Sequence, residues 1–155
     1  MPTLNADCAT RQLDGFLAKF TPEIEARAHA IIAKMRARLP GATIPVYDNY
    51  NALAVGFGSS DRVSDVIFSI AVFPRWVSLF LVGGPKLDDP KTLLKGEGST
   101  VRHIVLAGPR TLDDPDVRAL MDQALALAKT PIDPAAPGGL IIKSISAKQR
   151  PRRPA

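Results

Sequence analysis

The chain has 155 residues, of which 46% are hydrophobic and 23% are charged, the balance of an ordinary globular domain with its own core. The formal net charge is +5, but residues 143–155 hold five cations and no acid, which leaves fifteen cations and fifteen anions in residues 1–142. The basic excess therefore belongs to a tail, and we do not expect a folded surface dedicated to nucleic acid.

Membrane insertion and secretion are not expected either. The longest apolar runs, such as residues 77–82, are too short to span a bilayer, and the N-terminus lacks the basic and then apolar segments of a secretory signal. The single cysteine, Cys8, has no partner for an internal disulfide. These features together predict a cytoplasmic protein.

Two helices are expected at the N-terminal end and one near the C-terminal end. Apolar residues at helical spacing over 13–20 predict a short amphipathic helix. The Thr-Pro-Glu sequence at 21–23 predicts the start of a second, because threonine caps well and proline suits the first helical turn. That helix should stop at the Pro-Gly pair, residues 40–41. The Asp-Asp-Pro sequence at 113–115 predicts a third helix that ends near Lys129.

Between these helices the hydrophobic pattern is typical of β-strands. The connections are short turns, which favour antiparallel neighbours because a parallel crossover needs a dozen or more residues. We therefore expect an α+β domain: an antiparallel sheet of about five strands packed against the N-terminal and C-terminal helices, its other face free for a shallow cavity or for self-association. The five expected strands are residues 43–47, 51–57, 64–73, 76–82 and 101–106.

The C-terminal region, residues 130–155, is expected to lie outside the domain formed by residues 1–129. Residues 130–139 are rich in proline and glycine, as in a linker. The segment 140–145 is short and β-like, and it could add an edge strand or stay mobile. Residues 148–155 are basic and expected to be disordered. Such a tail favours a solubilising role over weak, non-specific contact with nucleic acid.

The order of these elements resembles the YdhG-like family, a domain of unknown function. The resemblance covers residues 13–129 and rests on the helix entry at 20–23, the helix stop at 39–41, and the basic glycine-rich turn at 93–99 with the strand and acid-capped helix that follow it. It implies the α+β fold described above. Some family members are described as frataxin-like iron chaperones, so the resemblance also implies metal handling as an alternative function.

A basic, glycine-rich turn supplies the first candidate site, whose residues are Lys95, Gly98, Ser99 and Arg102. Glycines let backbone N–H groups turn toward an anion, and neighbouring cations add Coulomb attraction. The spacing is not that of a phosphate-binding loop, and Glu97 would repel a phosphate, so a solvated turn is the alternative. The favoured function is a non-enzymatic binding or accessory protein for a small anionic ligand.

Tyr47, Asp48 and Trp76 form a second set of candidate ligand-binding residues. A phenol and a carboxylate beside a turn could line a cleft, and a tryptophan next to Arg75 could offer a stacking platform. The alternatives are a hairpin turn and an aromatic that covers the core edge. The YdhG-like family usually has an acidic residue and a Gly-Met-Pro-like turn in this region. This chain departs from that pattern, so no family role is transferred to Tyr47 or Asp48.

Metal binding and catalysis have weaker support. The aspartates that could offer oxygen ligands are already explained as helix caps, and His29 and His103 show no metal-ligand spacing. An enzyme that uses Tyr47, Asp48 and His103 is the third alternative, without a recognisable nucleophile and base. No catalytic residue, metal ligand or cofactor is assigned, and a protein partner or a homodimer is left open. The aspartates are Asp88, Asp89, Asp113, Asp114 and Asp116.

Overall fold

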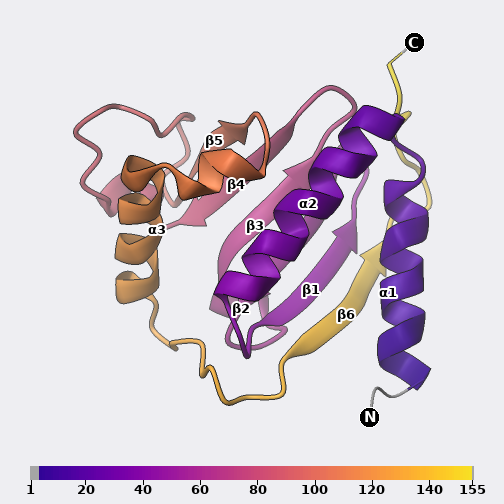
Figure 1. Cartoon of the computed structure of the whole chain (residues 1–155), viewed down its shortest axis with the longest axis horizontal. Helices are drawn as coiled ribbons and strands as arrows, with labels where there is room; N and C mark the ends of the chain where they lie inside the picture. Colours follow the sequence, from indigo (N-terminus) through magenta and orange to yellow (C-terminus); the bar gives the residue numbers. More distant parts are fainter. Residues whose placement is uncertain (1–3, 155) are drawn as a thin grey trace.

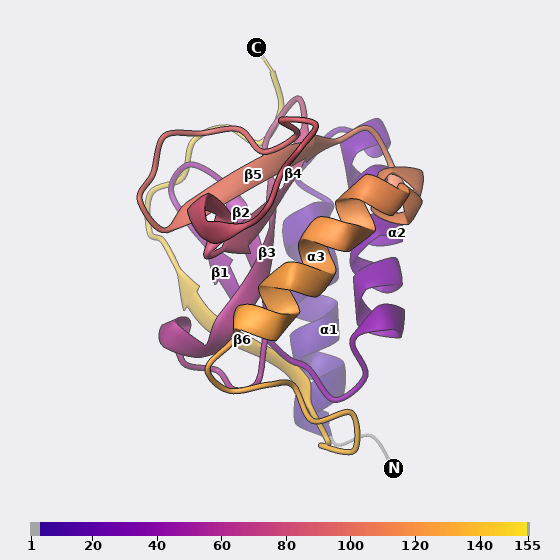
Figure 2. The ribbon, with the colours of Figure 1, turned by 90° about the vertical axis from the view of Figure 1, so that its left-hand side faces the viewer.

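The protein folds into two layers, a twisted six-stranded sheet and three helices (Figure 1). The structure is a computed structural model that describes the backbone of residues 4–154 and the side chains of residues 8–154. Figure 2 shows that all three helices lie on the same side of the sheet. None of the helices in this described part is both long and apolar enough to cross a membrane.

The sheet confirms the expected α+β class and has one strand more than the expected five. Its strand order is β5-β4-β3-β2-β1-β6. The neighbours from β5 to β1 are antiparallel, as the short turns predict, whereas β6 runs parallel to β1. The strands are β1 (Thr43–Asp48), β2 (Leu53–Gly58), β3 (Val66–Val72), β4 (Val77–Val82), β5 (Val101–Leu106) and β6 (Gly139–Ile145).

Local capping chemistry explains where the helices begin. Thr21 precedes α2, and its hydroxyl accepts a hydrogen bond from the backbone N–H of Ile24 at 3.4 Å. Asp114 precedes α3, and its carboxylate accepts from the N–H of Asp116 at 2.8 Å. The first helix starts earlier than its apolar pattern indicated. The helices are α1 (Leu4–Leu17), α2 (Pro22–Arg38) and α3 (Pro115–Leu127), with short 3-10 helices η1 (Val63–Asp65), η2 (Gly84–Lys86) and η3 (Pro109–Asp113).

The hydrophobic core lies between the helices and one face of the sheet. Alternate residues of the central strands, such as Val55, Ile70 and Leu79, are completely buried there, as is Ile31 of α2. A register shift between β2 and β3 leaves Ile67 as an extra residue in the ladder. Because such a bulge interrupts the alternation of side chains, both Ile67 and its neighbour Phe68 join the core.

The C-terminal segment differs from the expected disordered tail. After β6 the chain crosses the turn that follows β1, and backbone hydrogen bonds hold it there. Ser146 donates to the carbonyl of Asp48 and Arg150 donates to that of Tyr50, both at 2.9 Å. The side chain of Arg152 is 3% exposed. This part of the chain is therefore packed against the domain.

A buried carboxylate explains why the tail docks. Asp48 is 1% exposed, and an ionised carboxylate at that depth is costly unless it is paired. Nη2 of Arg152 lies 2.8 Å from Oδ1 of Asp48 and also donates to the carbonyl of Asn49 at 2.6 Å. The guanidinium carbon is 5.7 Å from the centre of the Phe20 ring. Arg152 therefore neutralises Asp48 and closes the turn.

Candidate ligand-binding pocket

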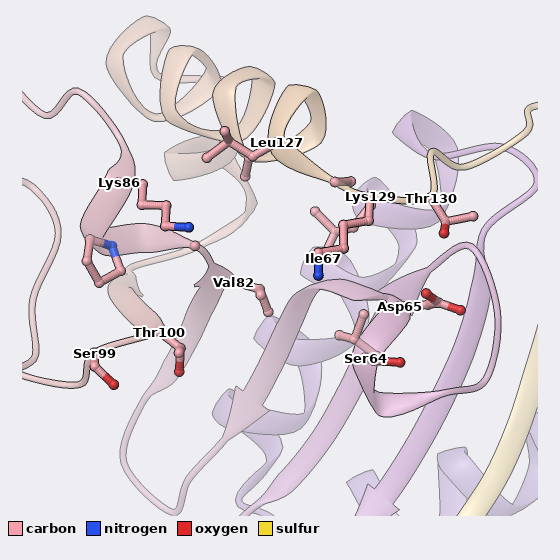
Figure 3. Close-up of a pocket in the computed structure, with 15 residues that line it drawn as sticks. Ser64, Asp65, Ile67, Val82, Lys86, Ser99, Thr100, Leu127, Lys129 and Thr130 are labelled. Carbon is pink, nitrogen blue, oxygen red and sulfur yellow. The ribbon is translucent and has the colours of Figure 1, made fainter.

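A hollow of about 600 Å³ lies where the beginning of β3, the end of β4 and the end of α3 meet (Figure 3). This volume falls in the range typical of small-molecule sites. Its lining comes from four separated stretches of the chain: residues 64–67, 82–86, 99–100 and 124–130. The hollow is thus a product of tertiary structure and not of one local motif.

Two glycines shape the wall at the end of β4. Gly83 has a φ of +79°, a conformation that favours glycine, and it turns the chain into η2. Its N–H donates to the carbonyl of Thr100 at 2.7 Å, which holds residues 99–100 beside the hollow. A Cβ on Gly84 would lie 2.5 Å from Cβ of Arg102, so only glycine fits there. This turn carries Lys86 to the edge of the hollow.

The other walls come from α3 and from the loop before β3. Ala124, Leu127 and Ala128 contribute small and apolar surface, and the chain then continues into Lys129 and Thr130. Opposite them lie η1 and the start of β3. The apolar side chains are incompletely covered, since Leu127 is 50% exposed and Val82 is 40% exposed. A hollow lined by exposed apolar side chains is a typical ligand-binding feature.

Two lysines give the hollow a positive character. Figure 3 shows Lys86 and Lys129 directed toward its interior from opposite sides. Within the described part of the chain, neither has a carboxylate within salt-bridge distance. Four other lysines do: Lys19, Lys34, Lys91 and Lys143.

Asp65 is the one acid among the lining residues, and its Oδ2 accepts from the hydroxyl of Ser60 at 2.6 Å. The C-terminal end of α3 also brings the negative end of a helix dipole to this place. Lys129, two residues beyond α3, offsets that dipole. Lys86 is therefore the cation with the most charge available for a ligand.

The structure brings only part of the first predicted site into this hollow. Ser99 belongs to the lining. Lys95 forms an isolated antiparallel bridge with His103, with backbone hydrogen bonds of 2.8 and 3.0 Å, and lies outside it. Gly98 sits in the exposed turn, and Arg102 packs against η2.

Sequence reasoning did not find Lys86 and Lys129. They are 43 positions apart and share no motif. The Gly-Gly-Pro sequence before Lys86 was a turn signal and carried no information about what the turn faces.

Tyr47, Asp48 and Trp76 do not form one cleft. Tyr47 and Asp48 are consecutive in β1, so their side chains lie on opposite faces of the sheet. Asp48 is occupied by Arg152. Trp76 stacks on Phe73, with ring centres 4.6 Å apart, in the turn just before β4. Each residue therefore has a different environment.

The residues of the enzyme alternative are also apart. His103 is in β5, and three strands separate β5 from β1, a distance of about 19 Å at the usual strand spacing. His103 instead packs beside Phe80, with ring centres 5.2 Å apart. Strand β5 therefore places no base next to Tyr47 or Asp48.

The predicted aspartates serve separate structural roles. Asp113 pairs with both Lys34 and Arg38, and the hydrogen bond from Lys34 holds the pKa of Asp113 below its usual value. Asp89 accepts from the N–H groups of Leu93 and Leu94 at 2.9 and 2.8 Å.

The other three aspartates also have structural partners and do not gather into a metal site. Asp114 caps α3, Asp116 pairs with Lys91 at 2.8 Å, and the backbone of Asp88 is bonded to Gln123. Among the side chains of residues 8–154, no group of three or more His, Cys, Asp or Glu is placed to hold a metal ion.

The chain matches no protein-family model, no curated protein and no solved structure. The resemblance to the YdhG-like family therefore stays a prediction, and the geometry of the site carries the functional argument.

Proposed function

We propose that this protein is a non-enzymatic binding domain for a small organic anion that occupies the hollow between β3, β4 and α3. One observation carries the proposal: two lysines without an acidic partner point into a hollow of about 600 Å³ whose walls expose apolar side chains. Of the six other lysines, four are paired with an acid in the described chain.

The lining suggests the class of ligand. The apolar wall formed by Val66, Ile67 and Leu127 suits a hydrocarbon or ring, while hydroxyl groups at the edge can orient polar atoms. Lys86 and Lys129 add charge attraction for a carboxylate or a phosphate. A molecule with both an apolar body and one anionic group fits this pattern best. Iron handling, which the family resemblance implies, has no carboxylate cluster behind it in the described residues and is not proposed.

A thermal-shift screen followed by calorimetric titration tests the proposal. The probes are inorganic phosphate, nucleoside monophosphates, aromatic and medium-chain carboxylates, and ferrous and zinc ions. A ligand present at about a hundred times its Kd stabilises the native state by about 2.7 kcal/mol, which raises the Tm of a chain this size by roughly 5–10 °C. We expect this shift from an amphipathic anion. A shift from the metal ions alone would refute the proposal.

Paired lysine variants locate the binding site. Lys86→Ala with Lys129→Ala should weaken anion binding at least about tenfold, and Lys86→Ala should have the larger single effect because Lys129 also offsets the dipole of α3. The matched control is Lys95→Ala with Lys148→Ala, since these lysines also lack an acidic partner in the described chain and lie outside the hollow. Equal losses from both pairs would indicate non-specific attraction and refute the site.

A steric variant tests the same hollow without a change of charge. Ala128→Trp should fill the space at the end of α3 and abolish binding, because Ala128 belongs to the lining. Ala126→Trp on the exposed side of α3 is the control and should bind as the parent does. Retained binding in Ala128→Trp would place the ligand elsewhere.

A further inference from the structure

The face of the sheet opposite the helices has an unusual composition. No helix of the described chain covers it (Figure 2). Strand register places twelve of its side chains in two rows that cross all six strands. The first row is Ile141, Pro45, Gly56, Ser69, Phe80 and His103. The second row is Ser144, Tyr47, Ala54, Ala71, Ser78 and Val105.

None of the twelve residues in these rows is Asp, Glu, Lys or Arg, although 23% of the chain is charged. A sheet face in contact with water usually carries polar and charged side chains, which alternate along each strand with the apolar side chains of the buried face. Large apolar side chains are instead left open there, such as Val105, which is 52% exposed. Depletion of charge with exposure of apolar and aromatic groups is typical of the centre of a protein–protein interface.

The same face has a trough beside a ridge. The trough is defined by small residues on β2 and β3: Ala54 and Ser69 are half-buried, and Gly56 and Ala71 are buried at its floor. The ridge consists of Phe73 stacked on Trp76, and of Phe80 packed beside His103, on and around β4 and β5. Trp76 is 40% exposed.

Two hydroxyl groups on this face lack partners within the described structure. Ser78 is 1% exposed, and its Oγ makes no hydrogen bond. The hydroxyl of Tyr47 is also buried and unpaired. Both oxygens are shielded by side chains of the same chain, so the centre of this face is closely packed in the monomer.

We propose that this face binds a second copy of the same chain through a two-fold interface, in which the ridge of each copy lies in the trough of the other. A two-fold interface needs a surface that is complementary to itself, and a ridge parallel to a trough on one face meets that need. The absence of ionised side chains from these two rows also favours this occupant. A nucleic acid or an acidic partner would require cations on the face, whereas two copies with a net charge of +5 associate best through a neutral one.

The size of the face sets the expected strength. The six strands lie about 4.8 Å apart and are about 20 Å long. The face therefore has an area of roughly 500 Å² per copy, so a dimer would bury about 1,000 Å² in total. This value is at the lower end of specific interfaces. We therefore expect a dimer that forms in the micromolar range and dissociates on dilution.

The only tryptophan of the chain, Trp76, lies on the ridge and reports on the contact directly. Sedimentation velocity and Trp76 emission are measured from micromolar to millimolar concentrations of the full chain. We expect the sedimentation coefficient to rise while the emission moves to shorter wavelength over the same range. Added salt should not weaken association, because it screens the repulsion between two cationic copies. A chain that stays monomeric up to millimolar concentration, with unchanged emission, would overturn the proposal.

A charge placed in the trough tests the geometry. Ala54→Arg and, independently, Ser69→Lys should weaken dimerisation at least about tenfold, since each buries an unpaired charge in a neutral contact. Ala30→Arg, on the exposed face of α2, is the matched control and should dimerise as the parent does. Circular dichroism establishes that each variant is folded. Undiminished dimerisation in both folded trough variants, or equal loss in the control, would refute this surface.

The test is independent of the proposed ligand site. The variant with Lys86→Ala and Lys129→Ala keeps the whole face intact, so it should dimerise as the parent does. A failure to bind anions would therefore refute the ligand site but not the dimer, and a failure to dimerise would refute the dimer but not the ligand site.

Discussion

Replacing Arg152 with alanine removes the partner of a buried carboxylate. The side chains of Arg152 and Asp48 are 3% and 1% exposed, and their closest atoms are 2.8 Å apart. Arg152 also donates to the carbonyl of Asn49 at 2.6 Å and contributes a longer contact of 3.5 Å to that of Tyr50. In Arg152→Ala, Asp48 stays buried and loses its closest cation, and only Nζ of Lys19, at 3.8 Å, remains near it.

The expected loss follows from that uncompensated charge. Breaking a buried ion pair by removal of one member typically costs about 3–5 kcal/mol of unfolding free energy. Two features place Arg152→Ala near the lower end of that range. First, Nζ of Lys19 is 3.8 Å from Oδ2 of Asp48 and partly compensates the negative charge of Asp48. Second, the ion pair with Arg152 uses only one carboxylate oxygen, because Oδ2 of Asp48 and Nε of Arg152 have no hydrogen-bond partner. We therefore expect a loss of about 3 kcal/mol.

Equilibrium unfolding in urea measures this loss. The midpoint should fall while the slope stays nearly constant, because the folded state remains compact. Arg153→Ala is the matched control: Arg153 is adjacent and exposed, and it bonds only the carbonyl of Lys19, so its loss should be below about 0.5 kcal/mol. Asp48→Leu combined with Arg152→Met should recover most of the stability, since an apolar pair removes both charges. An Arg152→Ala variant as stable as the Arg153→Ala variant would refute the docked tail.

Other variants test local features of the fold. Because Lys34 holds the pKa of Asp113 below its usual value, this pair stabilises the protein above about pH 4 and less as the pH falls. Tm measured against pH should therefore drop less on acidification in Asp113→Asn. Gly41 has a φ of +83°, and a Cβ there would clash with the carbonyl of Asp133. Gly41→Ala should lower the free energy of unfolding, measured in urea, by more than about 1 kcal/mol, whereas Gly15→Ala, in open space on α1, should raise it.

Local chemistry made much of the fold predictable. The caps at Thr21 and Asp114, and the turns between the antiparallel strands, depend on residues a few positions apart, so their patterns are visible along the chain. The parallel pairing of β6 with β1 is not visible in that way. Its partner strand precedes it by about 90 residues, and no local pattern specifies which edge of the sheet a short apolar segment joins.

The candidate sites were harder to predict for the same reason. Arg152 and Arg153 are the same residue type in one basic segment, yet only Arg152 is buried, because only it reaches Asp48. Lys86 and Lys129 differ from the other lysines because tertiary structure brings both of them to the hollow. Sequence identified the glycine-rich turn that leads to Ser99 but not the hollow that Ser99 faces.

The parallel strand β6 also affects the order in which this protein folds. Asp48 and Arg152 are 104 positions apart, so their contact closes one of the longest loops in the chain. Contacts of such separation tend to form late, after the antiparallel strands have paired through short turns. Until then β1 is an unprotected outer strand, a known route to association between partly folded chains. Pro45, which has no N–H to donate, leaves β1 with one fewer group for such pairing during that interval.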